Sequence, residues 1–81
     1  MFYCYILRSE KTGRFYIGSA EDVAKRLLEH NSGRVTSTRG RGPWACVWKE
    51  GFPTRADAVK RERQIKSWKS AGAIRNLIGE V

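Results

Sequence analysis

The 81-residue chain has few cysteines and histidines and no long apolar run, which are the features of metal-cluster and membrane proteins. It contains two cysteines, two prolines and one histidine, and its eight acidic residues are half as many as its 16 basic ones. No apolar run approaches the roughly 18 residues of a membrane span. The N-terminus has no basic region leading into an apolar stretch, as a secretory signal would. The sequence therefore predicts a cytoplasmic protein without a membrane partner.

The two cysteines offer no metal site. Cys4 and Cys46 lie in separate segments, without the paired Cys or Cys/His spacing of zinc ligands. A structural disulfide is disfavoured in a reducing compartment. We expect both side chains to serve as small apolar strand residues.

The length and the charge narrow the class of partner. A chain of 81 residues has room for one domain, which we predict over 1–81. The net charge of +8 favours an anionic partner, with nucleic acid first. A chain this short buries only about 60% of its unfolded surface, so we expect a surface groove rather than an internal cavity. DNA or RNA as the partner, and a monomer or a weak homodimer, both stay open.

Hydrophobic periodicity and turn residues predict an α+β fold. Aromatic and β-branched runs suit strands, and apolar residues at helical spacing follow them. The expected elements are strands over 2–7 and 15–17, a helix over 20–30, a basic loop over 34–43, a strand over 44–48, and helices over 54–69 and 71–79. Their ββαβαα order predicts a three-stranded, mainly antiparallel sheet packed with helices.

Local signals place the ends of these elements. Ser19 and Asp22 resemble a capping box at the start of the first helix. Thr54 repeats this signal for the second helix. Gly51 and Pro53 are expected to end the third strand.

Glu62 is the most informative residue of the second helix, because it stands on the face that should turn toward the protein body. One interpretation is a surface ion pair with Lys66 at i,i+4, worth about 0.3 to 0.5 kcal/mol. The other is a ligand to a divalent metal, since Mg²⁺ takes one or two carboxylates together with water and phosphate oxygens. The spacing leaves both open.

Two further groups of side chains suit phosphate chemistry. Arg26 and His30 stand at i,i+4 on one helix face, where a guanidinium and an imidazole could grip a phosphate or relay a proton. Tyr3 and Tyr5 share one face of the first strand, and Tyr16 lies on its partner. The tyrosines are either an aromatic packing pair or, beside enough cations, a source of phenolate.

These residues carry a resemblance to a known family. Tyr3-Cys4-Tyr5 and Tyr16-Ile17-Gly18, followed in order by Arg26, His30 and Glu62, resemble the GIY-YIG nuclease superfamily. The likeness covers nearly the whole chain. It is greatest to the small stand-alone bacterial UPF0213 or YhbQ-like group, which shares the loop over 38–43 and the helix over 61–66.

The resemblance implies a role for each residue of the site. Tyr5 and Tyr16 would be the two motif tyrosines, one of which acts on the attacking water, and which one stays open. Arg26 would stabilise the scissile phosphate, and His30 occupies a position where relatives have histidine or tyrosine. Glu62 would be the sole protein ligand of one Mg²⁺ or Mn²⁺ ion.

The chain also departs from the family pattern. Its first motif lacks the glycine, and Ser19 stands where some relatives have lysine. Ile74 stands where others have asparagine, so Asn76 is a candidate only through a shift of the last helix.

Cations outside this set would contact the phosphate backbone, with affinity that falls with salt and little base readout. The candidates are Arg34, Arg39, Arg41, Lys60, Arg61 and Lys66. The tryptophans Trp44, Trp48 and Trp68 either complete the core or stack on exposed bases.

The predicted function is a Mg²⁺-dependent endonuclease that hydrolyses DNA phosphodiester bonds, selects DNA structure and acts in DNA repair or processing. The alternative is a non-catalytic nucleic-acid-binding module on the same scaffold.

Overall fold

The computed structural model describes residues 1–79, and their elements follow the predicted ββαβαα order. The domain predicted over 1–81 thus includes two residues that lie outside the described part. The elements are β1 (Phe2–Ser9), β2 (Phe15–Ala20), α1 (Val23–Asn31), a short 3₁₀ helix η1 (Thr36–Thr38), β3 (Trp44–Phe52), α2 (Arg55–Ser67) and α3 (Ala71–Leu77). This confirms the predicted α+β class.

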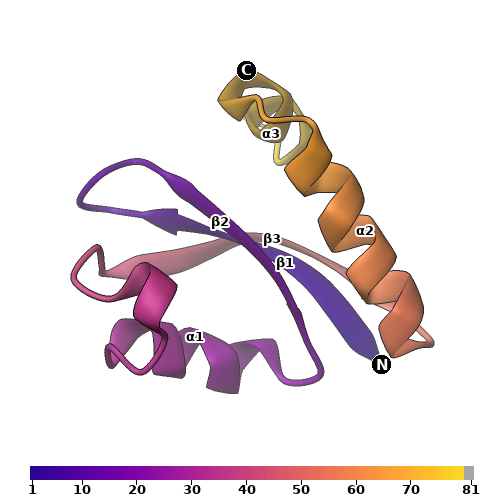
Figure 1. The fold of residues 1–81 in the computed structure, drawn as a ribbon, viewed down its shortest axis with the longest axis horizontal. Helices are drawn as coiled ribbons and strands as arrows, with labels where there is room; N and C mark the ends of the chain where they lie inside the picture. The colour runs from indigo at the N-terminus through magenta and orange to yellow at the C-terminus, as the bar shows by residue number, and fades with distance from the viewer. Residues whose placement is uncertain (80–81) are drawn as a thin grey trace.

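The sheet has the strand order β2-β1-β3, with β1 in the centre (Figure 1). Both neighbours pair with β1 in antiparallel register, so the described sheet is antiparallel throughout. The register sets Gly18 opposite Tyr5 and Tyr16 opposite Leu7. Because side chains alternate along a strand, the two motif tyrosines lie on one face as diagonal neighbours.

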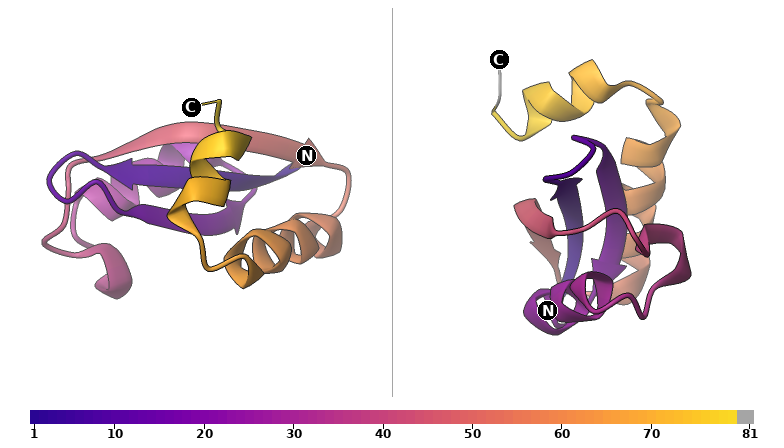
Figure 2. Two further views of the ribbon diagram at one scale, coloured as in Figure 1. Left: turned by 90° about the horizontal axis from the view of Figure 1, so that it is seen from above. Right: turned by 90° about the vertical axis from the view of Figure 1, so that its left-hand side faces the viewer.

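Each face of the sheet has its own apolar core, because alternate residues of β1 point to opposite sides. Cys4 and Ile6 pack with Ile65 of α2 and Ile74 of α3. On the other face, the buried residues that pack together are Tyr5, Leu7, Val23 and Trp44. Figure 2 shows the sheet with α1 separated from α2 and α3. Tyr5 therefore lies on the face that packs with α1, while Cys4 and Ile6 pack with α2 and α3 on the other face.

The first helix begins later than predicted. Ser19 and Ala20 pair with Cys4 and Tyr3 as the end of β2, so the chain is still extended at these positions. Asp22 caps α1 by accepting a hydrogen bond from the Lys25 backbone N–H at 3.0 Å. The predicted capping box over 19–22 was therefore wrong in its first residue, because sheet pairing held Ser19 in the strand.

The third strand continues past its predicted end at Trp48 and includes Gly51. Gly51 pairs with Tyr3, and a side-chain carbon at this glycine would lie only 3.2 Å from the Tyr3 ring. The glycine therefore makes room for a cross-strand ring rather than stopping the strand. The chain leaves the sheet at Phe52, and Thr54 caps α2 as predicted, by accepting from the Asp57 N–H at 3.2 Å.

The last helix, predicted over 71–79, spans Ala71–Leu77 and is capped by Ser70. The basic segment over 34–43 is not a simple loop, because it contains η1. Asn31 closes it by accepting from the Trp44 backbone N–H at 2.6 Å and donating to the Trp44 carbonyl at 3.1 Å. This clamp fixes where η1 lies beside α1.

Cys4 and Cys46 are both free thiols. Burial raises the pKa of Cys4 to about 11, so its thiol stays neutral and serves as core, as predicted. Within residues 1–79, no helix is long and apolar enough to cross a membrane.

Candidate functional site

The centre of the candidate site is a contact between a strand and a helix. The Tyr5 hydroxyl lies 3.1 Å from His30 Nε2, and both residues are almost fully buried. Tyr5 comes from the central strand β1, and His30 from the last turn of α1. The i,i+4 spacing brings Arg26 of the same helix close enough for its positive charge to act against the raised pKa of Tyr5. The structure thus gathers three of the predicted site residues around one oxygen atom.

Thr38 fixes the proton positions in this contact. His30 Nδ1 lies 2.8 Å from Thr38 Oγ1, and the Thr38 hydroxyl donates to the Val35 carbonyl at 3.3 Å. A hydroxyl has one proton, so a Thr38 hydroxyl that donates to Val35 accepts from His30 Nδ1–H. The neutral imidazole then has an unprotonated Nε2, and Tyr5 donates to it. The buried row therefore runs from Tyr5 through His30 and Thr38 to a backbone carbonyl.

Tyr16 completes the aromatic wall of the site. Its ring meets the His30 ring edge-on with centroids 4.7 Å apart, and its centroid is 6.4 Å from that of Tyr5. Gly18 stands opposite Tyr5 in the ladder, and a side-chain carbon there would lie 2.6 Å from the Tyr5 hydroxyl oxygen. The glycine of the second motif therefore leaves the space that the Tyr5 hydroxyl fills.

The environment sets the charge of these groups. Burial is the main cause that raises the pKa of Tyr5 to about 12, against the opposing influence of Arg26. Burial, followed by the positive charge of Arg26, lowers the pKa of His30. At neutral pH the site thus holds a phenol beside a neutral imidazole, which is the state in which His30 can accept a proton.

Arg26 is also tied to its own helix. Its Nη1 lies 3.2 Å from Glu29 Oε1, and this carboxylate leads the causes that raise the pKa of Arg26. Arg26 is therefore a fixed cation that reaches both Tyr5 and the surface.

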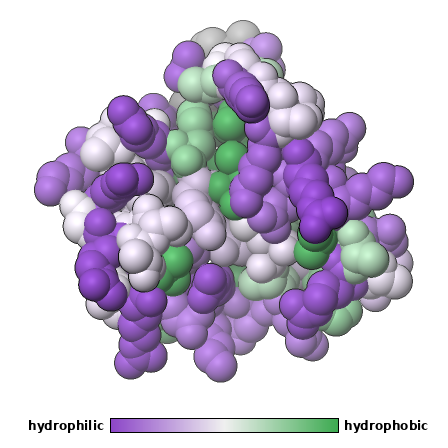
Figure 3. All heavy atoms as spheres, viewed as in Figure 1, coloured by the Kyte–Doolittle hydropathy of each residue, from purple (hydrophilic) through white to green (hydrophobic). Residues whose placement is uncertain are grey.

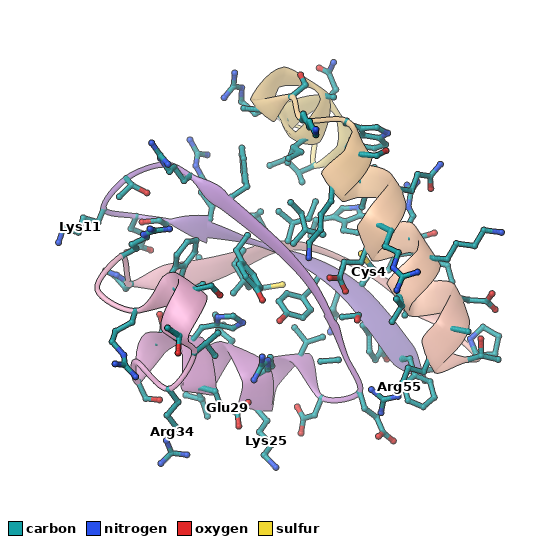
Figure 4. All side chains as sticks on the ribbon, viewed as in Figure 1. Cys4, Lys11, Lys25, Glu29, Arg34 and Arg55 are labelled. Carbon is teal, nitrogen blue, oxygen red and sulfur yellow. The ribbon has the colours of Figure 1, made fainter. Side chains whose placement is uncertain are left out.

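Glu62 lies on α2, the helix that packs on the face of the sheet opposite Tyr5. Its side chain is 18% exposed, and its charge is among the causes that raise the pKa of Tyr5. Its Oε2 accepts from Lys66 Nζ at 2.6 Å, so the surface ion pair predicted at i,i+4 is confirmed. Figure 4 shows α1 and α2 carrying side chains on either side of the strands. The carboxylate thus lies within electrostatic reach of the tyrosine.

The donor chemistry fits one divalent cation. Among residues 1–79, no group of three histidine, cysteine or acidic side chains could enclose a metal ion. Mg²⁺ does not need such a cage, because one carboxylate with waters and phosphate oxygens is a usual ligand set. An ionised carboxylate has two acceptor oxygens, and the ion pair with Lys66 uses one of them.

The predicted phosphate-contacting residues divide into two groups. Arg34, Arg39, Arg41, Lys60 and Lys66 are exposed, and Figure 4 shows Arg34 pointing away from the body. Arg61 differs, because it pairs with Glu50 at 3.1 Å and lies 5.8 Å from the ring centroids of both Trp48 and Trp68.

Of the last predicted residues, Asn76, Trp48 and Trp68 lie outside the cluster. Asn76 is exposed on α3, which packs on the opposite face of the sheet. Trp44 is buried beside Tyr16 and donates its indole N–H to the Thr38 carbonyl at 3.2 Å, whereas Trp48 and Trp68 are half-buried at the other core. The described tryptophans thus serve as core.

Sequence reasoning missed Thr38 as a member of the site. A threonine in a basic loop has no distinguishing pattern, and its role depends on the fold that carries η1 to His30. The one available signal was that His30, a polar residue on an apolar helix face, needs a partner when buried.

With this geometry in place, comparison with known proteins defines the family. The model of the GIY-YIG catalytic domain matches residues 1–76. The chain therefore belongs to the GIY-YIG catalytic domain family.

Two individual relatives show which members of the family the chain is similar to. A UPF0213 protein of Staphylococcus saprophyticus is 40% identical over 67 residues, which is 82% of this chain and 80% of that protein. The solution NMR structure of a UPF0213 protein from Bacillus halodurans matches with a TM-score of 0.61 and 34% identity, over 98% of this chain and 84% of that one. The fold and the membership of this bacterial group are thus both confirmed.

A longer fungal protein is also similar. The structure-specific endonuclease subunit slx1 of Pyrenophora tritici-repentis is 38% identical over 88 residues, which covers 99% of this chain. The chain spans only 23% of that protein.

Proposed function

We propose that the chain is an endonuclease that hydrolyses DNA phosphodiester bonds with the help of one divalent metal ion. The observation that carries this proposal is the Tyr5–His30–Thr38 row beside Arg26. The family match supports nuclease chemistry, and the likeness to a structure-specific endonuclease subunit supports selection by DNA structure. A role in DNA repair or processing goes with this proposal.

In this mechanism Tyr5 is the group that handles the proton of the attacking water. A phenol with a raised pKa is a poor base by itself, so its own proton needs an acceptor. His30 Nε2 lies at hydrogen-bond distance and is unprotonated in the tautomer that Thr38 selects. As water attacks phosphorus, the bond from phosphorus to the leaving oxygen breaks and that oxygen takes a proton from solvent. In the same step the proton of the attacking water passes to the Tyr5 oxygen, and the Tyr5 proton passes to His30.

Arg26 stabilises charge in two places. Its positive charge near the Tyr5 hydroxyl favours the phenolate, because a cation lowers the cost of the charged form. The same guanidinium can fork onto an oxygen of the scissile phosphate, where charge grows in the transition state. Tyr16 packs on His30 and shields this exchange from bulk water.

Glu62 would hold the metal ion, with Mg²⁺ or Mn²⁺ as candidates. Bound there, a divalent ion would supply positive charge to the phosphate and to the leaving oxygen. Lys66 is the residue that balances the carboxylate before the ion binds.

The test compares Glu62→Gln with Glu50→Gln, an exposed carboxylate on β3 that pairs with Arg61. Duplex, flapped, branched and single-stranded DNA are incubated with Mg²⁺, Mn²⁺ or EDTA. We expect Glu62→Gln to reduce cleavage to the level seen in EDTA, with DNA binding kept, and Glu50→Gln to cleave like the parent. Binding without product for the parent in every metal would refute the enzyme and favour the non-catalytic binding module.

Further predictions accompany this proposal. The single domain over 1–81, the cytoplasmic location and a monomer or weak homodimer stay predictions, as does RNA as a second partner. Phosphate contacts by Arg34, Arg39, Arg41 and Lys60 are proposed on their exposure and charge.

A further inference from the structure

A concave surface lies apart from the Tyr5–His30 contact. It is a groove of about 420 Å³ between the β1–β2 turn and the junction of α2 and α3. The hairpin contributes Phe15 and Ile17, and the helices contribute Ile65 and Ile74. Figure 3 shows hydrophobic surface in this region, bordered by hydrophilic side chains. We call it the hairpin groove.

The floor of the hairpin groove is apolar and fixed. Ile65 and Ile74 are buried members of the core, and Phe15 and Ile17 are half-buried against them. A flat aromatic or heterocyclic ring can pack on such a floor without displacing any side chain. The groove is therefore preformed, as small ligand sites usually are.

The rim of the groove is basic. Arg14, Lys66 and Lys69 line it, and no acidic residue is among the described lining residues. Within residues 1–79, neither Arg14 nor Lys69 forms an ion pair, whereas Lys66 pairs with Glu62. An apolar floor under a cationic rim suits a ligand that combines a ring with negative charge.

The backbone at Lys69 adds a second observation. Its φ is +49°, a left-handed conformation that a non-glycine residue seldom adopts. A glycine would take this conformation more readily. The chain instead has lysine at the turn where α2 meets α3, which keeps a cation on the groove rim.

One residue connects the hairpin groove to the candidate site. Lys66 lines the groove and also contacts Glu62, the proposed metal ligand. A DNA strand whose phosphate lies near Glu62 would therefore have its neighbouring nucleotide within reach of the rim, since successive phosphates are only a few ångströms apart along a strand.

We propose that the hairpin groove binds an unpaired nucleotide of the DNA substrate, with its base on Phe15 and Ile17 and its phosphate at Arg14 and Lys69. This inference rests on the proposed function and names the structural feature of the DNA that the domain selects. Bases in a duplex are stacked and paired, so only an unpaired base can enter the groove without the cost of extrusion. The groove would then favour DNA with a single-stranded extension over blunt duplex.

The test measures binding rather than cleavage. Fluorescence anisotropy in EDTA compares a blunt duplex with the same duplex carrying a single-stranded oligothymidylate extension. We expect the parent to bind the extended DNA about tenfold more tightly, which corresponds to about 1.4 kcal/mol and lies within the range for stacking one base on an aromatic ring.

Substitutions at two positions locate this preference in the groove. Ala71 is exposed and lines the groove, so Ala71→Leu obstructs it and should remove the preference while affinity for blunt duplex stays unchanged. Ala71→Ser keeps the side chain small and should behave like the parent. Lys69→Gly removes the rim cation at a position where glycine fits the backbone, and should weaken binding of the extended DNA more than Lys25→Ala, a matched removal of charge on α1.

The outcomes separate this inference from the proposed function. Equal affinity of the parent for both DNAs, or a preference that persists in Ala71→Leu, would overturn the groove assignment while leaving metal-dependent cleavage untouched. Failure of the parent to bind either DNA would overturn both.

Discussion

The Tyr5 hydroxyl lies 3.1 Å from His30 Nε2, and Thr38 lies 2.8 Å from Nδ1 on the far side of the imidazole. We expect Tyr5 to donate to Nε2, because a Thr38 hydroxyl that donates to the Val35 carbonyl accepts from Nδ1–H. His30 is the only histidine of the chain. A long-range ¹⁵N NMR spectrum would therefore contain the signals of one imidazole, and no resonance assignment is needed to find which ring nitrogen carries the proton. We expect that spectrum to show the tautomer protonated at Nδ1.

The pH dependence follows from the lowered pKa of His30. Burial and Arg26 disfavour the imidazolium, so the acceptor state persists below the reference pKa of 6.5. The acidic limb of kcat against pH should lie below 6.5 and coincide with the titration of the single imidazole by NMR. A limb above 6.5 would mean that His30 is not the acceptor.

Stability should follow the same titration. The unfolded chain binds a proton on His30 near pH 6.5 and the folded chain only at lower pH, so the unfolded state holds more protons in between. The free energy of unfolding contributed by His30 is thus fully present above pH 6.5 and falls as the pH drops through the folded pKa. Denaturant titrations across this window, compared with His30→Gln, measure the contribution.

Thr38 allows the row to be tested without changing a group that contacts substrate. Thr38→Val keeps the shape but leaves the buried Nδ1–H without an acceptor, which should cost about 1 to 3 kcal/mol of stability. We expect kcat to fall with KM nearly unchanged, and the single imidazole signal to lose its Nδ1 preference. Thr38→Ser keeps the hydroxyl and should restore both.

A purely structural role for Thr38 has a different signature. Thr38→Val would then lower stability and the concentration of active protein, while the tautomer and the pH profile of the folded fraction stayed as in the parent. That result would remove Thr38 from the proposed mechanism.

Gly18 tests the fit between the second motif and Tyr5. In Gly18→Ala, the added carbon would lie 2.6 Å from the Tyr5 oxygen and 2.7 Å from its ring, so the ring has to move. We expect the free energy of unfolding to fall by about 1 to 3 kcal/mol, as for other overpacked sites. The activity of the fraction that stays folded should also fall, because the Tyr5 hydroxyl is displaced. Gly72→Ala is the control, since its nearest neighbour would be at 3.7 Å and helix propensity favours alanine.

Thr54 and Ser19 show which parts of the structure were readable in the sequence. Thr54 caps α2 as predicted, because a helix cap depends on neighbours along the chain. Ser19 carries a similar signal and yet lies in β2, because its pairing with Cys4 depends on a distant segment. The order of Tyr5, Arg26 and His30 predicted a cluster that the structure brings together. Thr38 had no such signal, since only the closed loop carries it to the imidazole.

Arg61 and Lys60 should separate packing from phosphate binding, although they are adjacent on α2. Arg61 is held by Glu50 and lies against Trp48 and Trp68. Arg61→Ala should therefore cost about 1 kcal/mol of stability, because it removes the cation–π interactions. Lys60 is exposed, and Lys60→Ala should leave stability within about 0.5 kcal/mol.

DNA binding should show the reverse order. A cation that neutralises a phosphate contributes about one unit to the slope of log affinity against log salt, and its removal should lower that slope by the same amount. We expect Lys60→Ala to reduce the slope and Arg61→Ala to leave it nearly unchanged, once each variant is measured at a temperature where it is folded. A reduced slope for Arg61→Ala alone would mean that its guanidinium leaves the tryptophans to meet the DNA, and that α2 rearranges on binding.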